Sequence, residues 1–348
     1  MGWEETLDGY GALVEERLRG FFAKAIEEAR NYHPFITTVH SSLEEFVLRR
    51  GKRLASCSTL LTYKGYTGSI DDKILSVCVG MELYRHSILV HDDLVDMDDL
   101  RRGGKTLHKT LGKNYSPRLG EGTAVFAGNI AYTSAIEAIM DSGFSEEKVT
   151  RVLRLFSEGY REVNESQILD LLFEYKDVDV AEWRAMASRR AASLFKVAIL
   201  TGAILAGAPE SDLPILEEAA VKMGYSFDIQ DDIIDTFAHE EQYGRPPGRD
   251  IARGKKPLHV ICTLNSADQE ASRTLKKLLG KKNLSREDIN LVRTVIRKSG
   301  GLDAAKRMLE KCVDEAISLI SRTNLQEDVK AFFNSLITYI EESLDWYR

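Results

Sequence analysis

The stretch LEEAAVKMGYSFDIQDDIIDTF, residues 216–237, carries apolar side chains around most of a helical circumference. Residues three and four apart share one face of an α-helix, and here almost every face has such residues. A helix that is apolar on all sides is stable only where other segments cover it. The stretch therefore predicts a largely buried helix that carries three aspartates, Asp231, Asp232 and Asp235, into the protein interior.

Helical periodicity also dominates the rest of the chain, for example in residues 13–29, where apolar positions recur at steps of three and four. Alternating runs rich in Val, Ile and Thr and joined by Asn-Gly or Asp-Gly turns are missing, so we expect an all-α fold. No convincing linker interrupts the chain. We therefore expect one large helical domain over residues 1–348, with a motif-bearing core at about 45–265 and a helical part at 266–348.

Two segments interrupt this helical pattern, and a third is strongly polar. Residues 101–122 and 239–257 are rich in Gly, Pro, Arg and Lys, which predicts two loops. The stretch 265–290 is polar and charged, and it predicts solvated helix and turn.

The composition excludes several classes of protein. Lys and Arg number 47 against 54 Asp and Glu, a net charge of −7, so we expect no general attraction to nucleic acid. The most apolar later stretch, residues 197–208, is shorter than the ~20 residues that cross a bilayer, and the acidic start of the chain does not resemble a signal peptide. The four cysteines of the chain lie far apart, a pattern that is typical of proteins in a reducing compartment. We expect a cytoplasmic protein without a transmembrane segment.

Two acidic stripes stand out within helical sequence. The first, Asp92, Asp93 and Asp96, lies in SILVHDDLVDMDDL, and the second is the Asp231, Asp232, Asp235 set. Aspartates four residues apart lie one turn above each other, and their like charges destabilise a helix unless a cation compensates. Burial of such carboxylates costs several kcal/mol each without a partner or metal. A set of hard oxygen ligands without Cys favours Mg²⁺. We therefore expect all six aspartates to be buried and to converge around divalent ions that bind a pyrophosphate group.

Basic residues follow each acidic stripe. They are Arg101 and Arg102 after the first, and Arg245, Arg249, Arg253, Lys255 and Lys256 after the second. Carboxylates, Mg²⁺ and basic side chains together can clamp a diphosphate. A further cluster, Arg49-Arg50-Gly51-Lys52-Arg53, could supply a second anion site that needs no metal. The simpler alternatives are a solvated acidic face for each stripe and a basic helix end for the cluster.

These motifs resemble those of the trans-isoprenyl diphosphate synthases, the polyprenyl synthetase family. HDDLVDMDDLRRGGKTLHK, residues 91–109, is similar to the family's first aspartate-rich motif, and FDIQDDIIDTF followed by YGRPPGRDIARGKKPL is similar to the second. The resemblance runs from about Gly51 to about Leu264. It implies a helical bundle with a central active-site cavity, a homodimer, and the Mg²⁺-dependent condensation of isopentenyl diphosphate with an allylic diphosphate.

The resemblance also implies roles for individual residues. Asp92, Asp96 and Asp231 would hold three Mg²⁺ ions per site, with Asp93, Asp232 and Asp235 supporting them. Arg101, Arg190, Arg245 and Lys255 would hold the allylic diphosphate. Lys52, Arg53, Arg85 and Arg102 would hold isopentenyl diphosphate, and Gln167 and Asp170 would lie on a helix that faces the first motif.

The chain departs from the family pattern in several positions. Arg50 and Ala55 replace a Gly and an Arg of GGKRxRP, Arg85 stands where a His or Gln is usual, Arg190-Ala191 replaces a Lys-Thr pair, Asp228 replaces a Gln, and Arg245 replaces a Lys. These changes leave the metal residues in place and put the isopentenyl contacts in question.

Product length is set in this family by the residues before the first motif. Ser87 and Ile88, five and four residues before Asp92, are not aromatic, and Tyr84 lies one turn deeper. A turn rises about 5.4 Å, comparable to one prenyl unit. We therefore expect a twenty-carbon product, geranylgeranyl diphosphate, with a longer-chain product as the alternative.

Four other interpretations remain. Gly104-Lys105-Thr106 could end a P-loop, but Asp99 stands where its first glycine belongs. A metal phosphohydrolase built on His91 and Asp92 would leave the second stripe unexplained, so we expect His91 to be a packing residue. A non-catalytic partner subunit and a terpene cyclase could share the fold, although intact aspartate motifs count against the first and the basic cluster at 49–53 against the second.

Overall fold

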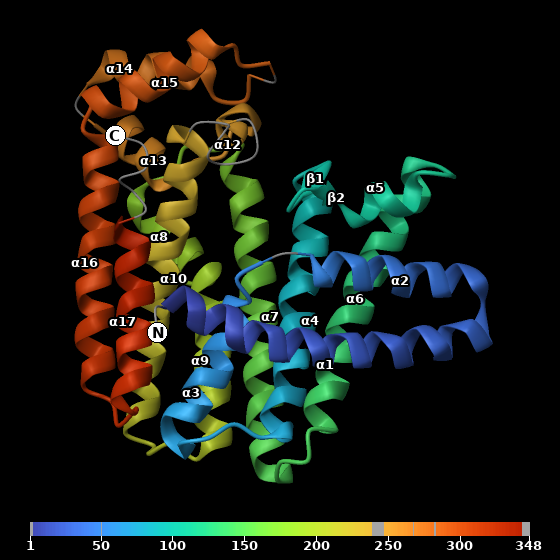
Figure 1. Ribbon diagram of the computed structural model, residues 1–348. Coiled ribbons are helices and arrows are strands. Elements are labelled where there is room, and N and C mark those ends of the chain that lie inside the picture. The colour runs from blue at the N-terminus through green and yellow to red at the C-terminus, as the bar shows by residue number, and fades with distance from the viewer. Residues whose placement is uncertain (1–2, 50, 239–246, 267, 282, 343–348) are drawn as a thin grey trace. The chain divides into compact units, whose positions relative to one another are not determined.

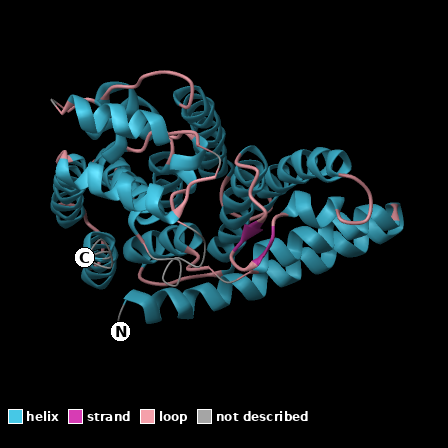
Figure 2. Cartoon of the chain, turned by 90° about the horizontal axis from the view of Figure 1, so that it is seen from above, coloured by secondary structure: helices cyan, strands magenta, loops and turns pink. Residues whose placement is uncertain are grey.

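The computed structural model describes residues 3–49, 51–238, 247–266, 268–281 and 283–342, and helices make up nearly all of their regular structure (Figures 1 and 2). They form two compact units. Unit 1 comprises residues 1–155, 198–208 and 325–329, and unit 2 comprises residues 156–197, 209–324 and 330–348. The prediction of a single domain stays a prediction. No helix in the described ranges combines the length and apolarity that a membrane span requires.

Unit 1 is built on α4, whose side chains are buried on most sides. The elements of unit 1 are α1 (Trp3–Tyr32), α2 (Pro34–Leu48), α3 (Leu54–Thr67), α4 (Asp72–Val95), the strands β1 (Leu100–Arg101) and β2 (Gly104–Lys105), α5 (Leu107–Gly112), α6 (Pro117–Met140) and the start of α7 (Glu146–Phe173). Small buried residues on α6, such as Ala131 and Ala135, let it approach α4 closely. A Cβ on Gly80 of α4 would lie 2.9 Å from the Ala135 carbonyl oxygen.

Two distant segments complete unit 1. Thr59 on α3 donates to the Ala198 carbonyl at 2.9 Å, which joins α3 to the second half of α9 (Ala191–Ala206). The backbone N–H of Gln326 donates to the Gly65 carbonyl at 2.9 Å.

Unit 2 is centred on α10 (Asp212–Phe237), which contains the second aspartate stripe and packs along α16 (Gly301–Ser321). Its other elements are the end of α7, α8 (Val180–Ala187), the start of α9, α12 (Arg249–Arg253), α13 (Leu258–Leu264), α14 (Gln269–Leu278), α15 (Arg286–Lys298) and α17 (Glu327–Glu342). Most apolar residues of α10 are buried, among them Leu216, Met223 and Ile233. The prediction of a largely buried helix is therefore confirmed.

The sequence predictions for the irregular segments were partly wrong. The expected loop at 101–122 contains the antiparallel β1–β2 pair, all of α5 and the start of α6. The expected loop at 239–257 contains α12, and its residues 239–246 lie outside the described ranges. The expectation of solvated helix and turn at 265–290 is confirmed by α14 and the start of α15.

Candidate functional site

The first aspartate motif lies at the end of α4. Asp92 and Asp93 occupy its last turn, and Asp96 is its C-cap. Carboxylates at a helix C-terminus are opposed by the macrodipole, so this position adds to their need for cations. Met97 follows in the left-handed region, with φ of 53°, and the backbone N–H of Asp98 donates to the Asp93 carbonyl at 2.9 Å. This turn directs the chain back toward the motif as the β1–β2 hairpin.

The hairpin brings Arg101 onto the aspartates. Its guanidinium lies 3.2 Å from Asp92 and donates from Nε to Asp93. The Asp93 side chain is buried, and burial raises its pKa to about 7, although Arg101 acts in the opposite direction. The second carboxylate oxygen of Asp93 is buried and accepts no hydrogen bond from the residues that the structure describes. A buried carboxylate of this kind fits a site for an additional cation.

His91 packs on the neighbouring helix. Its ring lies where a Cβ on Gly128 would stand, and its Nε2 is 3.1 Å from the Val125 carbonyl oxygen. This geometry agrees with the expected packing role.

The predicted chain-length residues lie further back on α4. Tyr84 is fully buried, and its ring centroid is 6.2 Å from that of Tyr132 on α6. The Ser87 hydroxyl donates to the Tyr84 carbonyl at 2.8 Å, and Ile88 is half-buried. An aromatic pair therefore stands one turn below the two smaller side chains.

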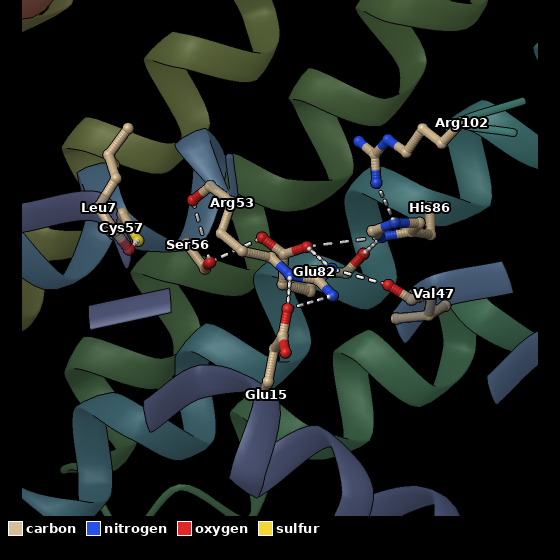
Figure 3. A network of polar contacts seen from close by, with 9 residues as sticks. All are labelled: Leu7, Glu15, Val47, Arg53, Ser56, Cys57, Glu82, His86 and Arg102. Carbon is tan, nitrogen blue, oxygen red and sulfur yellow. Dashed lines mark hydrogen bonds and ion pairs between the residues drawn. The ribbon is translucent and has the colours of Figure 1, made fainter. Parts of the chain in front are cut away.

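The basic cluster does not act as a single group. Lys52 is exposed and lies 3.6 Å from Glu4. Arg53 is buried, and it donates to Glu82 at 2.9 Å, to Glu15 at 3.1 Å and to the Val47 carbonyl at 2.7 Å (Figure 3). With its guanidinium so engaged, Arg53 holds α1, α2 and α4 together. The expected contact of Arg53 with isopentenyl diphosphate stays a prediction, and the position of this side chain in the packed interior of unit 1 counts against it.

Arg102 takes a different position from its neighbour Arg101. Its Nη1 is 3.4 Å from Nε2 of His86, and its Cζ would be 2.7 Å from a Cβ on Gly51. Burial and the positive charge of Arg85 lower the pKa of Arg102 to about 10. Arg85 and Arg102 thus form a positive patch beside the Gly51 backbone.

The charged cluster at the second aspartate motif, in unit 2, is centred on Arg190. Its guanidinium lies 3.1 Å from Asp228, 3.4 Å from Asp170 and 3.5 Å from Asp232. Lys255 is also 3.2 Å from Asp170. Burial raises the pKa of Asp232 well above its usual range, whereas Lys255 and Arg190 outweigh burial at Asp170 and lower its pKa. Two cations therefore share three carboxylates.

Asp235 anchors the segment that follows α10. Its carboxylate accepts from the backbone N–H of Asp250 at 3.1 Å, and its carbonyl accepts from that of Gly248 at 2.7 Å. These bonds fix the start of α12, which leads to Lys255. Asp250 was not singled out in the sequence, because its role depends on a backbone N–H that carries no residue-specific signal.

The expectation that all six aspartates are buried is only half right. Asp93, Asp232 and Asp235 are buried, Asp92 and Asp96 are half-buried, and Asp231 is exposed. The three more exposed residues are those expected to hold metal, which requires access to substrate and ion. Within the described ranges, no three His, Cys, Asp or Glu side chains form a preassembled metal site.

The remaining predicted residues have separate positions. Gln167 is half-buried on α7, and Arg245 lies outside the described residues. Each aspartate motif belongs to a different unit, so convergence of the two stays a prediction. The sequence analysis assigns no role to Glu82 and His86. Two polar side chains at i and i+4 in an apolar helix could have indicated that they interact.

Comparisons with known proteins agree with the motifs. Residues 36–296 match the family model described as polyprenyl synthetase, a longer stretch than the motifs themselves cover. A short chain isoprenyl diphosphate synthase of Methanocaldococcus jannaschii is 30% identical over 81% of this chain and 83% of its own. A geranylfarnesyl diphosphate synthase of Aeropyrum pernix is 31% identical over 84% and 90%.

Solved structures share the fold over the whole length. The geranylgeranyl pyrophosphate synthetase of Pyrococcus horikoshii has a TM-score of 0.85 and 26% identity, covering 98% of both chains. The geranylgeranyl pyrophosphate synthase of Corynebacterium glutamicum, complexed with isoprenyl diphosphate and magnesium, has a TM-score of 0.90 and 22% identity, covering 99% of this chain and 100% of that one.

Proposed function

Because the chain belongs to the polyprenyl synthetase family, it is a trans-prenyltransferase that condenses isopentenyl diphosphate with an allylic diphosphate, and we propose that its main product is geranylgeranyl diphosphate. The observation that carries the site assignment is the arginine beside each aspartate motif. Arg101 neutralises Asp92 and Asp93, and Arg190 neutralises Asp232. Such arginines can exchange a carboxylate partner for a phosphate oxygen, because both anions fit the guanidinium fork.

The reaction breaks one C–O bond and forms one C–C bond. Pyrophosphate leaves the allylic substrate with the bonding electron pair, the double bond of isopentenyl diphosphate attacks the allylic carbon, and one proton is lost to the departing pyrophosphate. Divalent metal use fits the all-oxygen donor set and the unpartnered Asp93 oxygen. We propose that Asp92, Asp96 and Asp231 hold three Mg²⁺ ions, which when bound supply charge neutralisation to the leaving diphosphate.

The protein's own groups position the two substrates. We propose that Arg101, Arg190, Lys255 and Arg245 bind the allylic diphosphate, and that Asp93, Asp232, Asp235 and Gln167 support this site. Lys52, Arg85 and Arg102 would bind the diphosphate of isopentenyl diphosphate, and Arg53 is left out because its guanidinium is bonded within the buried interior of unit 1. No side-chain base is required, so catalysis rests on preorganised charge and the exclusion of water.

The product length rests on Tyr84. A buried aromatic ring below Ser87 and Ile88 supports a floor that stops the chain at twenty carbons. A longer product, such as that named for the Aeropyrum pernix relative, is the second candidate.

Two finer proposals come from the resemblance and the cysteines. We propose a homodimer, as the family resemblance implies. A reducing compartment such as the cytoplasm is supported by four cysteines that are all free.

The test is to incubate the purified protein with Mg²⁺, isopentenyl diphosphate and each allylic primer in turn, and to size the products by chromatography. We expect geranylgeranyl diphosphate from the wild type and longer products from Tyr84→Ala. An unchanged product from that variant would refute Tyr84 as the floor. Absence of elongation with every primer would favour the cyclase or partner-subunit alternatives.

A further inference from the structure

Arg102 stands on a strained hairpin turn. Arg101 pairs with Gly104 across the β1–β2 hairpin, so Arg102 and Gly103 form its two-residue turn, and both have positive φ, 51° and 76°. This type of turn favours Asn-Gly or Gly-Gly, and a residue with a bulky side chain is disfavoured in the left-handed region. Backbone strain of this kind is often found at functional sites. The turn therefore directs one specific side chain at the cost of stability.

The Arg102 guanidinium lies in a confined place. Gly51 leaves the space for it, since a Cβ there would be 2.7 Å from both Cζ and Nη1. The charges around it include Arg85, Arg53, Arg101 and Glu82, with cations in excess. Like charges alone would push this flexible side chain away into solvent, so some contact must hold it.

His86 supplies that contact (Figure 3). Its side chain is only 1% exposed, Nδ1 lies 2.7 Å from the Glu82 carbonyl oxygen, and Nε2 lies 3.4 Å from Nη1 of Arg102. Burial lowers the pKa of His86 to about 3, so the ring is neutral and carries one N–H. Because Nδ1 faces a carbonyl, it is the donor, and Nε2 is left as an acceptor for the guanidinium.

Glu82 is itself fixed by two partners. Its carboxylate accepts from Arg53 at 2.9 Å and from the Ser56 hydroxyl at 2.6 Å. These contacts tie the turn of α4 that carries His86 to the start of α3. A rigid chain of groups therefore leads from the interior of unit 1 to the Arg102 guanidinium.

We propose that His86 is a positioning residue that accepts an N–H from Arg102 and holds the guanidinium over Gly51, so that its other N–H groups are left for the diphosphate of isopentenyl diphosphate. This inference rests on the proposed function, which assigns Arg102 to that substrate. His86 acts through Arg102, because its buried ring leaves no surface for substrate.

Steady-state kinetics of His86→Phe and His86→Gln test the proposal. Phe keeps the ring and removes the acceptor, so the KM for isopentenyl diphosphate should rise about five- to tenfold, as expected for a weakened hydrogen bond to a charged group. The KM for the allylic substrate should stay within about twofold of wild type. Gln places an acceptor near the position of Nε2 and should restore most of the loss. His40→Phe, a half-buried histidine on α2, is the matched control and should leave both KM values unchanged.

Binding of inorganic pyrophosphate without metal gives a second readout. Calorimetry should show about five- to tenfold weaker binding for His86→Phe and wild-type-like binding for His86→Gln. Gly51→Ala displaces the same guanidinium without removing a buried polar group, and it should weaken pyrophosphate binding as well. Melting temperatures of all variants identify any that fail to fold.

The outcomes separate the two proposals. If Arg102→Gln leaves the KM for isopentenyl diphosphate unchanged, the assignment of Arg102 under the proposed function fails. If Arg102→Gln raises that KM while His86→Phe and Gly51→Ala do not, the positioning role fails. An equal rise of both KM values in folded His86→Phe, without rescue by Gln, also overturns it and indicates a purely structural histidine.

Discussion

Arg190 and Asp228 both depart from the family pattern, and they contact each other. The Arg190 Nε donates to Asp228 at 3.1 Å, while the same guanidinium reaches Asp170 and Asp232. The planar fork of arginine can serve three carboxylates, which the compact ammonium of lysine does less well. A buried Asp228 in turn needs such a partner. The two replacements are therefore best understood as one coupled change that keeps the buried charges balanced.

This coupling predicts the behaviour of Arg190→Lys, Asp228→Gln and the double variant. Arg190→Lys alone should destabilise the protein by about 2 kcal/mol, because it leaves buried carboxylates incompletely paired. The double variant, which restores the family's residue types, should recover at least half of that loss. The measurement is the free energy of unfolding in urea. Strictly additive changes would show that the two positions are independent.

Individual residues also show how much of the site can be predicted from a single sequence. The family resemblance predicts that Arg101 and Arg190 serve an anion site, and the structure places each against aspartates of its own unit. The buried ion pairs of Arg53 could not be predicted, because its partners Glu15 and Glu82 come from distant positions with no shared motif. Spacing along a helix predicts which side chains share a face, whereas pairing between helices depends on packing that the pattern does not contain.

Among the secondary-structure elements, some could likewise be predicted from the sequence and others could not. Long periodic helices such as α10 were predictable, because burial imposes a repeating apolar pattern. The β1–β2 hairpin was not, since strands of two residues cannot show alternation and its turn lacks the usual Asn-Gly. The hairpin forms because the left-handed backbone of Met97 reverses the chain after α4. A methionine in the sequence does not indicate such a reversal.

Close approach of α9 and α10 depends on Gly224. A Cβ there would overlap the backbone of Ala192 at the start of α9, two residues after Arg190. Gly224→Ala should therefore push the two helices apart, destabilise unit 2 by about 1–3 kcal/mol and weaken the Arg190 contacts. Thermal unfolding and the KM for the allylic substrate would measure the two effects.

Gly20→Ala is the control for that experiment. Gly20 is exposed on α1 with nothing near its Cβ position, so alanine there should stabilise the protein by about 0.5–1 kcal/mol through helix propensity. Equal effects at the two glycines would contradict the packing role of Gly224.

At the scale of the whole molecule, acid stability depends in part on His86 in unit 1 and His259 in unit 2, the two most deeply buried histidines of the described residues. Burial lowers the pKa of each to about 3, against a usual 6.5. The unfolded chain then binds more protons between these values, so stability is full above pH 6.5 and is lost as the pH falls toward 3. At pH 5 each histidine should cost about 2 kcal/mol.

Replacement of His259 tests this dependence. Gln can still bond to Thr236, the neighbour 2.9 Å from Nε2, but it cannot titrate. The loss in unfolding free energy from pH 7 to pH 5 should be about 2 kcal/mol smaller in His259→Gln than in wild type. The same difference in both proteins would show that His259 does not contribute to acid unfolding.

The proposal that both aspartate motifs serve one diphosphate concerns the molecule as a whole, because each unit supplies one motif. Asp96→Asn and Asp231→Asn remove one charge from each with little change in shape. Groups that act together on one ligand show strongly non-additive losses. If each single variant lowers kcat/KM by about 100-fold, the double variant should lose little more than the worse single one. Asp99→Asn, which lies outside the Asp92, Asp93, Asp96 stripe and pairs with Lys109 at 2.9 Å, is the control and should change kcat/KM less than about twofold. A double variant that shows the full product of the two losses would mean that the motifs act on separate events.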